Sequence, residues 1–226
     1  MTTLNVLDRE MYSEAEAARL LRVPQSTLNY WLEGGQRGSK TYDPIIRVEK
    51  KGVRSPVTWA EFVEAGLLRS YRRDLGVRMA ELRTFIDRLR NDLGVPYPLA
   101  DRRPYVSNRD LVLRVQEDID LPSDLCLVSD VRGQLQLLPP SEEFLRRVRW
   151  DGDVVSGWRP HDDPDSSVWM LPSLRFGKPA VQGVSTEVIW EHADSGEDEE
   201  EIAQAFDLSL RDVRWALSYE TARRAA

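Results

Sequence analysis

The first apolar stripes of the chain lie between residues 12 and 35 and repeat at helical spacing. Three apolar side chains at i, i+3 and i+4 predict one short helix, and a second set of three predicts another a few residues later. The first set is Ala17, Leu20 and Leu21, and the second is Leu28, Trp31 and Leu32. Val23-Pro24 separates the two helices, because the residue before a proline disfavours helical backbone, and Gly34-Gly35 ends the second.

Ser13 and Glu16 have the spacing of a capping box, which starts the first helix. Two short helices joined by a tight turn predict a helix-turn-helix. The second helix leaves polar side chains outside its apolar stripe, of the kinds that hydrogen-bond to bases or phosphates. These candidate DNA-binding residues are Gln25, Ser26, Thr27, Asn29 and Tyr30. The same periodicity also fits a helical hairpin in an ordinary core, so both interpretations stay open.

The segment that follows predicts a β-hairpin. Its strands would be Ile45–Val48 and Ser55–Thr58, with Lys50-Lys51-Gly52 as the turn between them. A hairpin placed after a helix-turn-helix is a wing, and basic side chains at its tip would lie within reach of phosphate. The candidate phosphate contacts are Lys50, Lys51 and Arg54. An ordinary solvated turn is the alternative, because such residues are common in turns.

Two longer helices are predicted next. Thr58 and Glu61 repeat the capping-box spacing, and the helix that they start extends to Tyr71. Another helix opens at Gly76-Val77 and carries an apolar stripe as far as residue 93. The stripe consists of Leu82, Phe85, Ile86, Leu89 and Leu93. It fits either the core of its own domain or a contact with a second copy of the chain.

The remainder of the chain divides at about residue 165. In the middle segment, Leu125–Ser129 and Gln134–Leu138 predict a β-hairpin, Glu142–Arg149 a short helix, and Trp158–Ser167 a polar loop. Short strands are then predicted within 168–171 and 176–181, followed by three helices. The helices begin at Ser185-Thr186, at the acidic run Glu197–Glu201, and at the capping pair Ser209 and Asp212.

The predicted fold is therefore mainly α with small β elements. It combines an N-terminal winged helix-turn-helix with a C-terminal three-helix unit. We expect residues 1–98 to form a DNA-binding domain, residues 99–165 a mixed connecting segment with a β-hairpin, and residues 166–226 a helical domain. The breaker Gly94–Pro98 marks the first boundary.

Charge is distributed unevenly between the two halves. The net charge of the chain is −7, but residues 1–98 hold 16 basic and 13 acidic residues, a net +3, whereas residues 99–226 hold 15 and 25, a net −10. Residues 37–90 hold 13 basic and 7 acidic residues, a net +6. The positive excess thus follows the predicted helix-turn-helix, where a DNA-binding domain needs it.

Residue types that build active sites are scarce. The single cysteine, Cys126, lies in an apolar run and fits a reducing cytoplasm, and His161 and His192 lack metal-like partner spacing. There is no phosphate-binding glycine loop and no nucleophile elbow. The cluster His161–Asp165 fits a solvated loop better than a cation site. We expect a cytoplasmic binding protein with no enzymatic activity, metal or cofactor, and no membrane span.

The N-terminal pattern resembles the winged helix-turn-helix of the MerR family. The resemblance rests on Tyr12-Ser13, Ala17–Leu21, Val23-Pro24, Thr27–Trp31 and Gly34. In that family a T-L-R-Y-like segment places an arginine and a tyrosine on the DNA backbone. Tyr30 matches the tyrosine, whereas Asn29 stands where the arginine is common.

The C-terminal pattern is similar to a small helical family catalogued as a domain of unknown function, whose members are often antitoxins encoded beside PIN-like ribonuclease toxins. The resemblance rests on Phe176–Gly183, Glu187-Val188, Gly196-Glu197, Glu201–Ala203, Phe206–Leu208 and Val213–Glu220. Together the two resemblances look like a VapB-type antitoxin. They imply neutralisation of a PIN-like ribonuclease toxin and repression of the chain's own operon through operator DNA. A MerR-like regulator with a ligand-sensing middle segment and no toxin is the alternative.

The candidate toxin-binding residues are Trp190, Trp215, Tyr219, Arg223 and Arg224. Aromatic anchors often dominate interface energetics, and complementary charge speeds association. The alternative is that the three aromatic residues fill the core of the small domain. We also expect a homodimer, because one helix-turn-helix makes too few contacts for operator specificity and such proteins usually pair across a palindrome.

Overall fold

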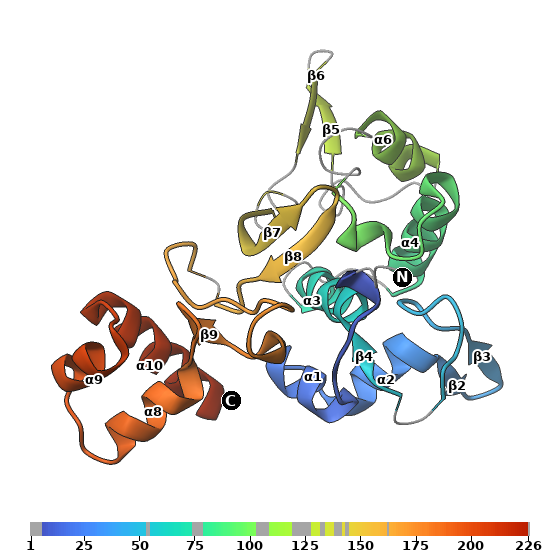
Figure 1. The fold of residues 1–226 in the computed structure, drawn as a ribbon. Coiled ribbons are helices and arrows are strands. Elements are labelled where there is room, and N and C mark those ends of the chain that lie inside the picture. The colour runs from blue at the N-terminus through green and yellow to red at the C-terminus, as the bar shows by residue number, and fades with distance from the viewer. Residues whose placement is uncertain are drawn as a thin grey trace, which may run out of the picture. The chain divides into compact units, whose positions relative to one another are not determined.

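The computed structural model describes residues 6–52, 55–73, 79–102, 109–118, 128–131, 134–137, 142, 145–161 and 163–225. Within these ranges the chain is mainly helical, and its strands pair only as small two-stranded sheets (Figure 1). This confirms the predicted fold class, mainly α with small β elements.

Contacts between Cα atoms divide the chain into two compact units. Unit 1 comprises residues 1–146 and 150–155, and unit 2 comprises residues 147–149 and 156–226. The division passes through one hairpin, formed by β7 (Val148–Asp151) and β8 (Val154–Trp158). The three segments predicted from the sequence stay a prediction, and each unit is described separately below.

In unit 1 a short helix pair, α1 and α2, is followed by two longer helices, α3 and α4. Its elements are η1 (Val6–Asp8), β1 (Glu10–Tyr12), α1 (Glu14–Leu20), α2 (Gln25–Glu33), β2 (Gly35–Arg37), β3 (Lys40–Tyr42), β4 (Val57–Thr58), α3 (Trp59–Arg73), α4 (Met79–Leu93), η2 (Pro98–Ala100), α6 (Arg109–Asp118), β5 (Val128–Val131) and β6 (Gln134–Leu137). The four helices α1 to α4 were predicted, whereas α6 was not.

Aromatic and aliphatic side chains from several of these elements form the core of unit 1. Trp59 stacks on Phe62 with ring centroids 5.8 Å apart, and Phe62 meets Tyr12 at 4.8 Å. Leu28 and Leu32 on the inner face of α2 are fully buried. The stripe on α4 also faces inward, since Leu82, Phe85, Ile86 and Leu89 are at most 3% exposed. These four side chains therefore serve the unit's own core.

The hairpin predicted over residues 45–58 is wrong. The structure has a hairpin directly after α2 instead, in which β2 pairs with β3 from Gly35↔Tyr42 to Arg37↔Lys40. Ile45 and Ile46 form no strand because they fill the core, and their backbone amides donate to the Trp31 carbonyl at 2.9 and 3.1 Å. The second predicted strand shrinks to β4, which pairs with β1.

The middle of the chain follows the prediction in part. β5 and β6 pair in an antiparallel hairpin, from Val128↔Leu137 to Val131↔Gln134, as the sequence predicted. The helix predicted to reach Arg149 ends earlier, because Val148 opens strand β7. Trp158, predicted in a loop, closes strand β8 and is 4% exposed. Cys126 and Asp162 lie outside the described residues.

Unit 2 contains the three C-terminal helices that the sequence predicted. Its elements after β8 are η4 (Arg175–Gly177), β9 (Ala180–Val181), β10 (Val184–Ser185), α8 (Thr186–Asp194), α9 (Glu199–Phe206) and α10 (Leu210–Arg224). The core cluster is Val168, Val181, Ile189, Ile202, Ala203, Val213, Ala216 and Tyr219. Asp198 and Glu201 form a complete capping box at the start of α9. The strand predicted at 168–171 is reduced to isolated bridges.

Candidate functional site

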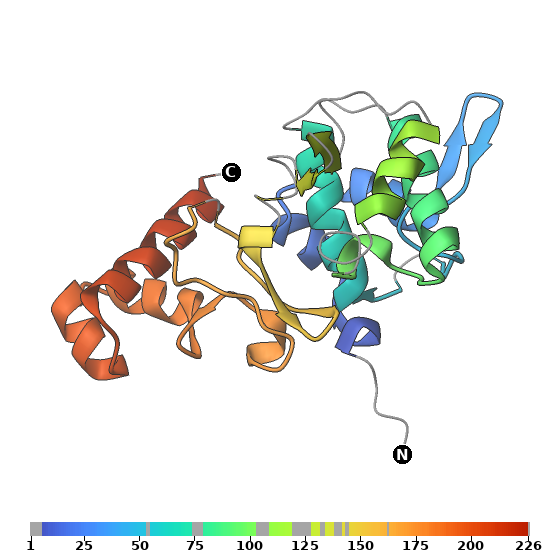
Figure 2. The same cartoon turned by 90° about the horizontal axis from the view of Figure 1, so that it is seen from above.

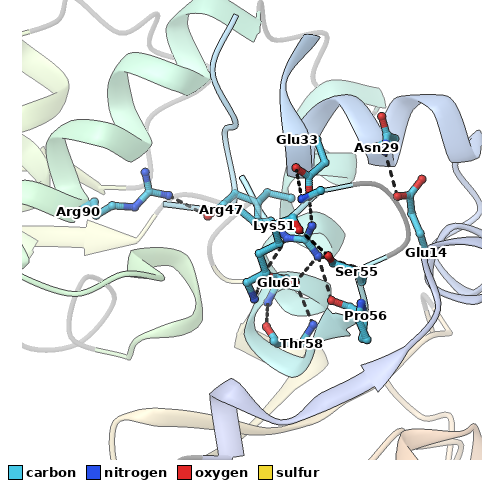
Figure 3. Close-up of polar contacts among 12 residues, drawn as sticks. Glu14, Asn29, Glu33, Arg47, Lys51, Ser55, Pro56, Thr58, Glu61 and Arg90 are labelled. Carbon is cyan, nitrogen blue, oxygen red and sulfur yellow. Dashed lines mark hydrogen bonds and ion pairs between the residues drawn. The ribbon is translucent and has the colours of Figure 1, made fainter. Parts of the chain in front are cut away.

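The helices α1 and α2 form a compact pair with a four-residue connection. The Ser13 hydroxyl accepts a hydrogen bond from the Glu16 amide at 3.2 Å, so one arm of the predicted capping box is present. Asn29 Nδ2 on α2 donates to Glu14 Oε2 on α1 at 3.0 Å and ties the two helices together (Figure 3). Asn29, predicted to contact DNA, thus has a partner within the pair.

The start of α2 is the exposed part of the predicted DNA-binding set. Gln25 and Ser26 are exposed, whereas Thr27, Asn29 and Tyr30 are half-buried. No side chain caps this helix, because its N-cap residue is Pro24. The first amides of an uncapped helix point towards solvent and can donate to an anion such as a phosphate. Tyr30 meets the Tyr42 ring edge-on at 6.2 Å and so supports the hairpin that follows.

The β2–β3 hairpin depends on one glycine at its base. Gly34 ends α2 with φ +70 and ψ −156, a conformation that only glycine adopts readily. A Cβ atom at this position would lie 2.2 Å from the Tyr42 carbonyl oxygen. The hairpin therefore leaves the helix at a fixed angle, and in Figure 2 it is the light-blue arm that projects from unit 1. Lys40, the first residue of β3 after the turn, is exposed.

A buried ion network holds the segment after the hairpin (Figure 3). The Arg47 side chain, 1% exposed, contacts Glu33 at the end of α2 and donates to Glu61 Oε1 at 3.0 Å and Oε2 at 3.2 Å. It also donates to the Pro56 carbonyl at 2.9 Å. Arg47 thus joins the end of α2, Pro56 and α3.

The Glu61 carboxylate is the centre of that network. It accepts hydrogen bonds from Arg47, from Lys51 Nζ at 2.9 Å and from the Thr58 amide at 2.9 Å, the last of which completes the predicted capping box. Burial acts to raise the pKa of Glu61, but these donors outweigh burial and hold the pKa below its usual value. Glu61 therefore stays charged at neutral pH.

The network separates the two candidate phosphate lysines. Lys51 is paired with Glu61, so its charge is largely committed within the chain. Lys50 is exposed and makes no ion pair with any residue that the structure describes. Arg54, the third candidate, lies outside the described residues. Of the two candidate lysines, Lys50 is the one without an ion pair to a described residue, and so the one with a charge available to a phosphate.

Two arginines of α4 hold the same region from the other side. Arg90 donates to the carbonyls of Ile45 and Ile46 at 2.9 and 3.1 Å, and Arg83 contacts the carbonyls of Asp43 and Pro44. Residues 43–46 are therefore held by these two arginines and by the Trp31 carbonyl rather than by strand pairing. The sequence did not indicate this role, because arginines on a helix read equally well as solvated charges.

Glu64, one turn after Glu61 on α3, is a buried acid outside this network. It is 1% exposed, and its Oε1 accepts from the Leu99 amide at 2.9 Å. Its Oε2 has no hydrogen-bond partner among the described residues. Burial raises the pKa of Glu64 to about 8, against the effect of the Leu99 amide. Glu64 is therefore predominantly neutral at pH 7.

The predicted toxin-binding residues of unit 2 are mostly engaged within the chain. Tyr219 is 2% exposed and belongs to the core, which is the alternative that the sequence left open. Arg223 Nε donates to the buried Glu220 at 2.7 Å, and Trp215 packs against His161. Arg224 lies over the ring of Trp190 at 5.0 Å, and its side chain is 43% exposed. Trp190, Trp215 and Arg224 keep exposed atoms.

An exposed aromatic residue that the sequence did not indicate lies elsewhere in unit 2. Phe176 is 75% exposed, more than the other large hydrophobic residues in the described part of the chain. The sequence placed it in a turn, and nothing in its spacing distinguished it from a core residue. No group of three or more His, Cys, Asp or Glu residues among those described could hold a metal ion. None of the described helices is long and apolar enough to cross a membrane.

Comparison with known proteins gives one family match and two relatives. Residues 170–219 match the family described as "Protein of unknown function (DUF433)", which confirms the C-terminal resemblance to a domain of unknown function. The chain is 32% identical to "Uncharacterized protein Rv2308" of Mycobacterium tuberculosis, over all of this chain and 96% of that protein. It is 27% identical to "Putative antitoxin VapB45" of the same organism, over 80% of each chain.

The fold is shared with a solved structure. The X-ray crystal structure of Rv2018 from Mycobacterium tuberculosis superposes with a TM-score of 0.76 at 24% identity. The likeness covers 94% of this chain and 100% of that one. At this identity the likeness shows the fold alone.

Proposed function

The chain belongs to the family of the mycobacterial protein Rv2308, and on that premise we propose that it is an antitoxin that neutralises a PIN-like ribonuclease toxin. The observation that carries the proposal is the likeness to VapB45, which extends over 80% of both chains and so includes more than the C-terminal domain. The protein acts by binding and not by catalysis. It works in the cytoplasm, where such a toxin meets its RNA.

The second part of the proposal is that the protein binds its own operator through unit 1. The MerR-like interpretation makes α2 the recognition helix, and the exposed Gln25 and Ser26 stand at its uncapped start. Helix N-termini and small polar side chains are common phosphate contacts. The β2–β3 hairpin takes the place of the wing that the sequence assigned to residues 45–58, and Lys40 is exposed on it.

The two neighbouring lysines give a matched test of DNA binding. K50A removes an exposed cation with no ion pair to a described residue, so it should lower affinity for any duplex and reduce the salt slope by about one unit. K51A removes a cation already paired with Glu61, so the slope should change little while stability falls. Fluorescence anisotropy with a random duplex and with the chain's own promoter region, over a salt series, measures both.

The opposite result would contradict the placement of this loop on DNA. If K51A lowers the salt slope and K50A leaves it unchanged, the assignment of the two lysines is reversed. If the wild-type chain binds neither duplex at low salt, DNA binding itself is excluded. If the wild-type chain does bind DNA, the double variant Q25A/S26A separates sequence preference from general affinity, because base contacts specify whereas phosphate contacts position.

A further inference from the structure

A strained turn in unit 2 presents an aromatic side chain to solvent. Arg175 and Phe176, within η4, have φ values of +50 and +53, which side chains with a Cβ rarely adopt. Phe176 is 75% exposed and the adjacent Leu174 is 37% exposed. A strained backbone persists only where the surrounding structure enforces it, and such sites gather at ligand-binding positions. Here the strained residue, Phe176, is apolar and yet exposed to solvent.

The turn is held rigidly by hydrogen bonds on both sides. The Leu174 amide donates to the Leu171 carbonyl at 2.9 Å, and the Gly177 amide donates to the Leu174 carbonyl at 3.0 Å. Arg175 Nε donates to the Gly183 carbonyl at 2.9 Å. A backbone that is already held in the bound conformation loses little conformational entropy when a partner binds. Phe176 therefore has the properties of an interface anchor.

The turn continues into a stack of two arginines on one tryptophan. The guanidinium of Arg149 lies 4.1 Å from the centre of the Trp169 ring, and that of Arg159 lies 4.4 Å from it. A Cβ added at Gly157 would lie 2.7 Å from Leu171 Cδ2 and 3.3 Å from Arg149 Cβ, so Leu171 and Arg149 meet over this glycine. Leu171 in turn forms a bridge with Leu174. We call Arg149, Arg159, Trp169, Leu174, Arg175 and Phe176 the basic–aromatic face.

Charge distinguishes this face from the rest of the C-terminal half. The half carries a net −10, yet the face contains three arginines and is followed by the exposed Lys178. Arg149, Arg175 and Lys178 make no ion pair with any other described residue. Burial lowers the pKa of Arg159 and the nearby charge of Arg149 lowers it further, whereas Asp165 and Asp163 act in the opposite direction.

We propose that the basic–aromatic face is the docking site for the toxin, and that it fits an apolar pocket edged by carboxylates on that protein. This inference rests on the proposed antitoxin function. A protein is favoured over RNA because arginines already cover the Trp169 ring, so bases cannot stack there, and because Leu174 and Phe176 suit a side-chain pocket. Arginine and aromatic residues are enriched at protein interfaces for the same reasons.

F176G in the full-length chain tests the apolar anchor. Glycine relieves the positive φ, so the melting temperature should stay equal or rise, whereas affinity for the toxin should fall by about tenfold or more. If Phe176 had only a structural role, F176G would not lower the affinity for the toxin while leaving the melting temperature unchanged or higher. The probe is the purified ribonuclease encoded beside the chain's gene, measured by biolayer interferometry with the wild-type chain alongside.

R149E and R211E form a matched pair for the charge. Both arginines are exposed in unit 2, and both substitutions change the charge equally, but Arg211 lies outside the face near Asp165. R149E should lower the association rate constant by about threefold or more at low salt, and R211E should leave it within about twofold. Hydrogen exchange in the complex should show protection over residues 171–178.

The other outcomes contradict either the antitoxin function or the docking site, and they can be told apart. If the wild-type chain does not bind the ribonuclease, the antitoxin function and this docking site both fail. If the wild-type chain binds it and F176G and R149E bind equally well, the docking site alone is wrong. If F176G abolishes self-association or binding of a single-stranded RNA oligonucleotide while toxin affinity is unchanged, the face serves a second copy or RNA instead.

Discussion

Glu64 shows how one buried residue links structure to pH. Its folded pKa of about 8 lies above the unfolded value of 4.5, so the stability associated with its neutral form is fully present below about pH 4.5. It is lost as pH rises towards 8, because the unfolded chain releases the proton more easily. The cost is about 1.4 kcal/mol for each pH unit over that range.

E64Q therefore gives a prediction with a definite sign. The amide keeps the shape of the neutral acid and cannot ionise, so at pH 4 the variant should match the wild type in free energy of unfolding. At pH 8 it should be more stable, by on the order of 4 kcal/mol. E49Q, the same change at an exposed position, should have no effect. Urea unfolding at both pH values measures the difference, and an E64Q variant that is less stable at pH 8 would contradict the buried neutral acid.

Residues that cap helices could be predicted from sequence, whereas residues that bridge elements could not. Ser13, Thr58 and Ser209 cap their helices, because a cap is a local arrangement whose partner lies three residues away. Arg47 could not be identified, since its partners Glu33 and Glu61 lie fourteen residues away on either side. Arg47 lies inside an apolar run, Ile45-Ile46-Arg47-Val48. An arginine at such a position indicates a buried ion pair, and this was the one signal in the sequence.

Among the elements, helices were predicted better than strands. The helices α1 to α4 and α8 to α10 have apolar stripes of period 3.6, which the local sequence specifies. The β2–β3 hairpin is polar, so it has no alternation of apolar and polar residues from which a strand could be predicted. The strand was predicted instead at the apolar run 45–48. Arg90 and the Trp31 carbonyl hold Ile45 and Ile46 in that run, and Arg83 holds Pro44 just before it; all of these are tertiary contacts.

Gly34 and Gly38 provide a matched pair at the scale of the hairpin. Both have positive φ, but a Cβ at Gly34 would lie 2.2 Å from the Tyr42 carbonyl oxygen, whereas a Cβ at Gly38 meets nothing within 4 Å. G34A should cost about 3 kcal/mol or more, and G38A about 1 kcal/mol. G34A should also weaken DNA binding at a temperature where it is still folded. Chemical denaturation and anisotropy measure these effects, and equal costs for the two variants would exclude a close contact at Gly34.

At the scale of the whole molecule, the proposed operator binding predicts that two copies of unit 1 act together, because one helix-turn-helix makes too few contacts for operator specificity. The stripe on α4, one of the two dimer surfaces that the sequence suggested, is buried in the unit's own core. We therefore expect dimerisation through the C-terminal helices, as a proposal. Light scattering at micromolar concentration should give about twice the 26.0 kDa of one chain. A monomer both with and without promoter DNA would contradict this assembly.

Truncated chains are poor tools for dividing the functions. A cut after residue 98 would remove the Leu99 amide that donates to the buried Glu64, and the bridge between Asp101 and Val154. Unit 1 includes both segments, so a 1–98 fragment would lose parts of its own core. Substitutions in the full-length chain test the same questions without that loss.

The central claim is that the chain neutralises a ribonuclease by binding it. The most direct measurement is to co-express the full-length chain with the ribonuclease encoded beside its gene, purify the two on a tag carried by the ribonuclease, and measure RNA cleavage. We predict that the two proteins co-purify and that cleavage is suppressed at equimolar amounts. A ribonuclease that purifies alone and cleaves RNA at the same rate with and without the chain would contradict the account.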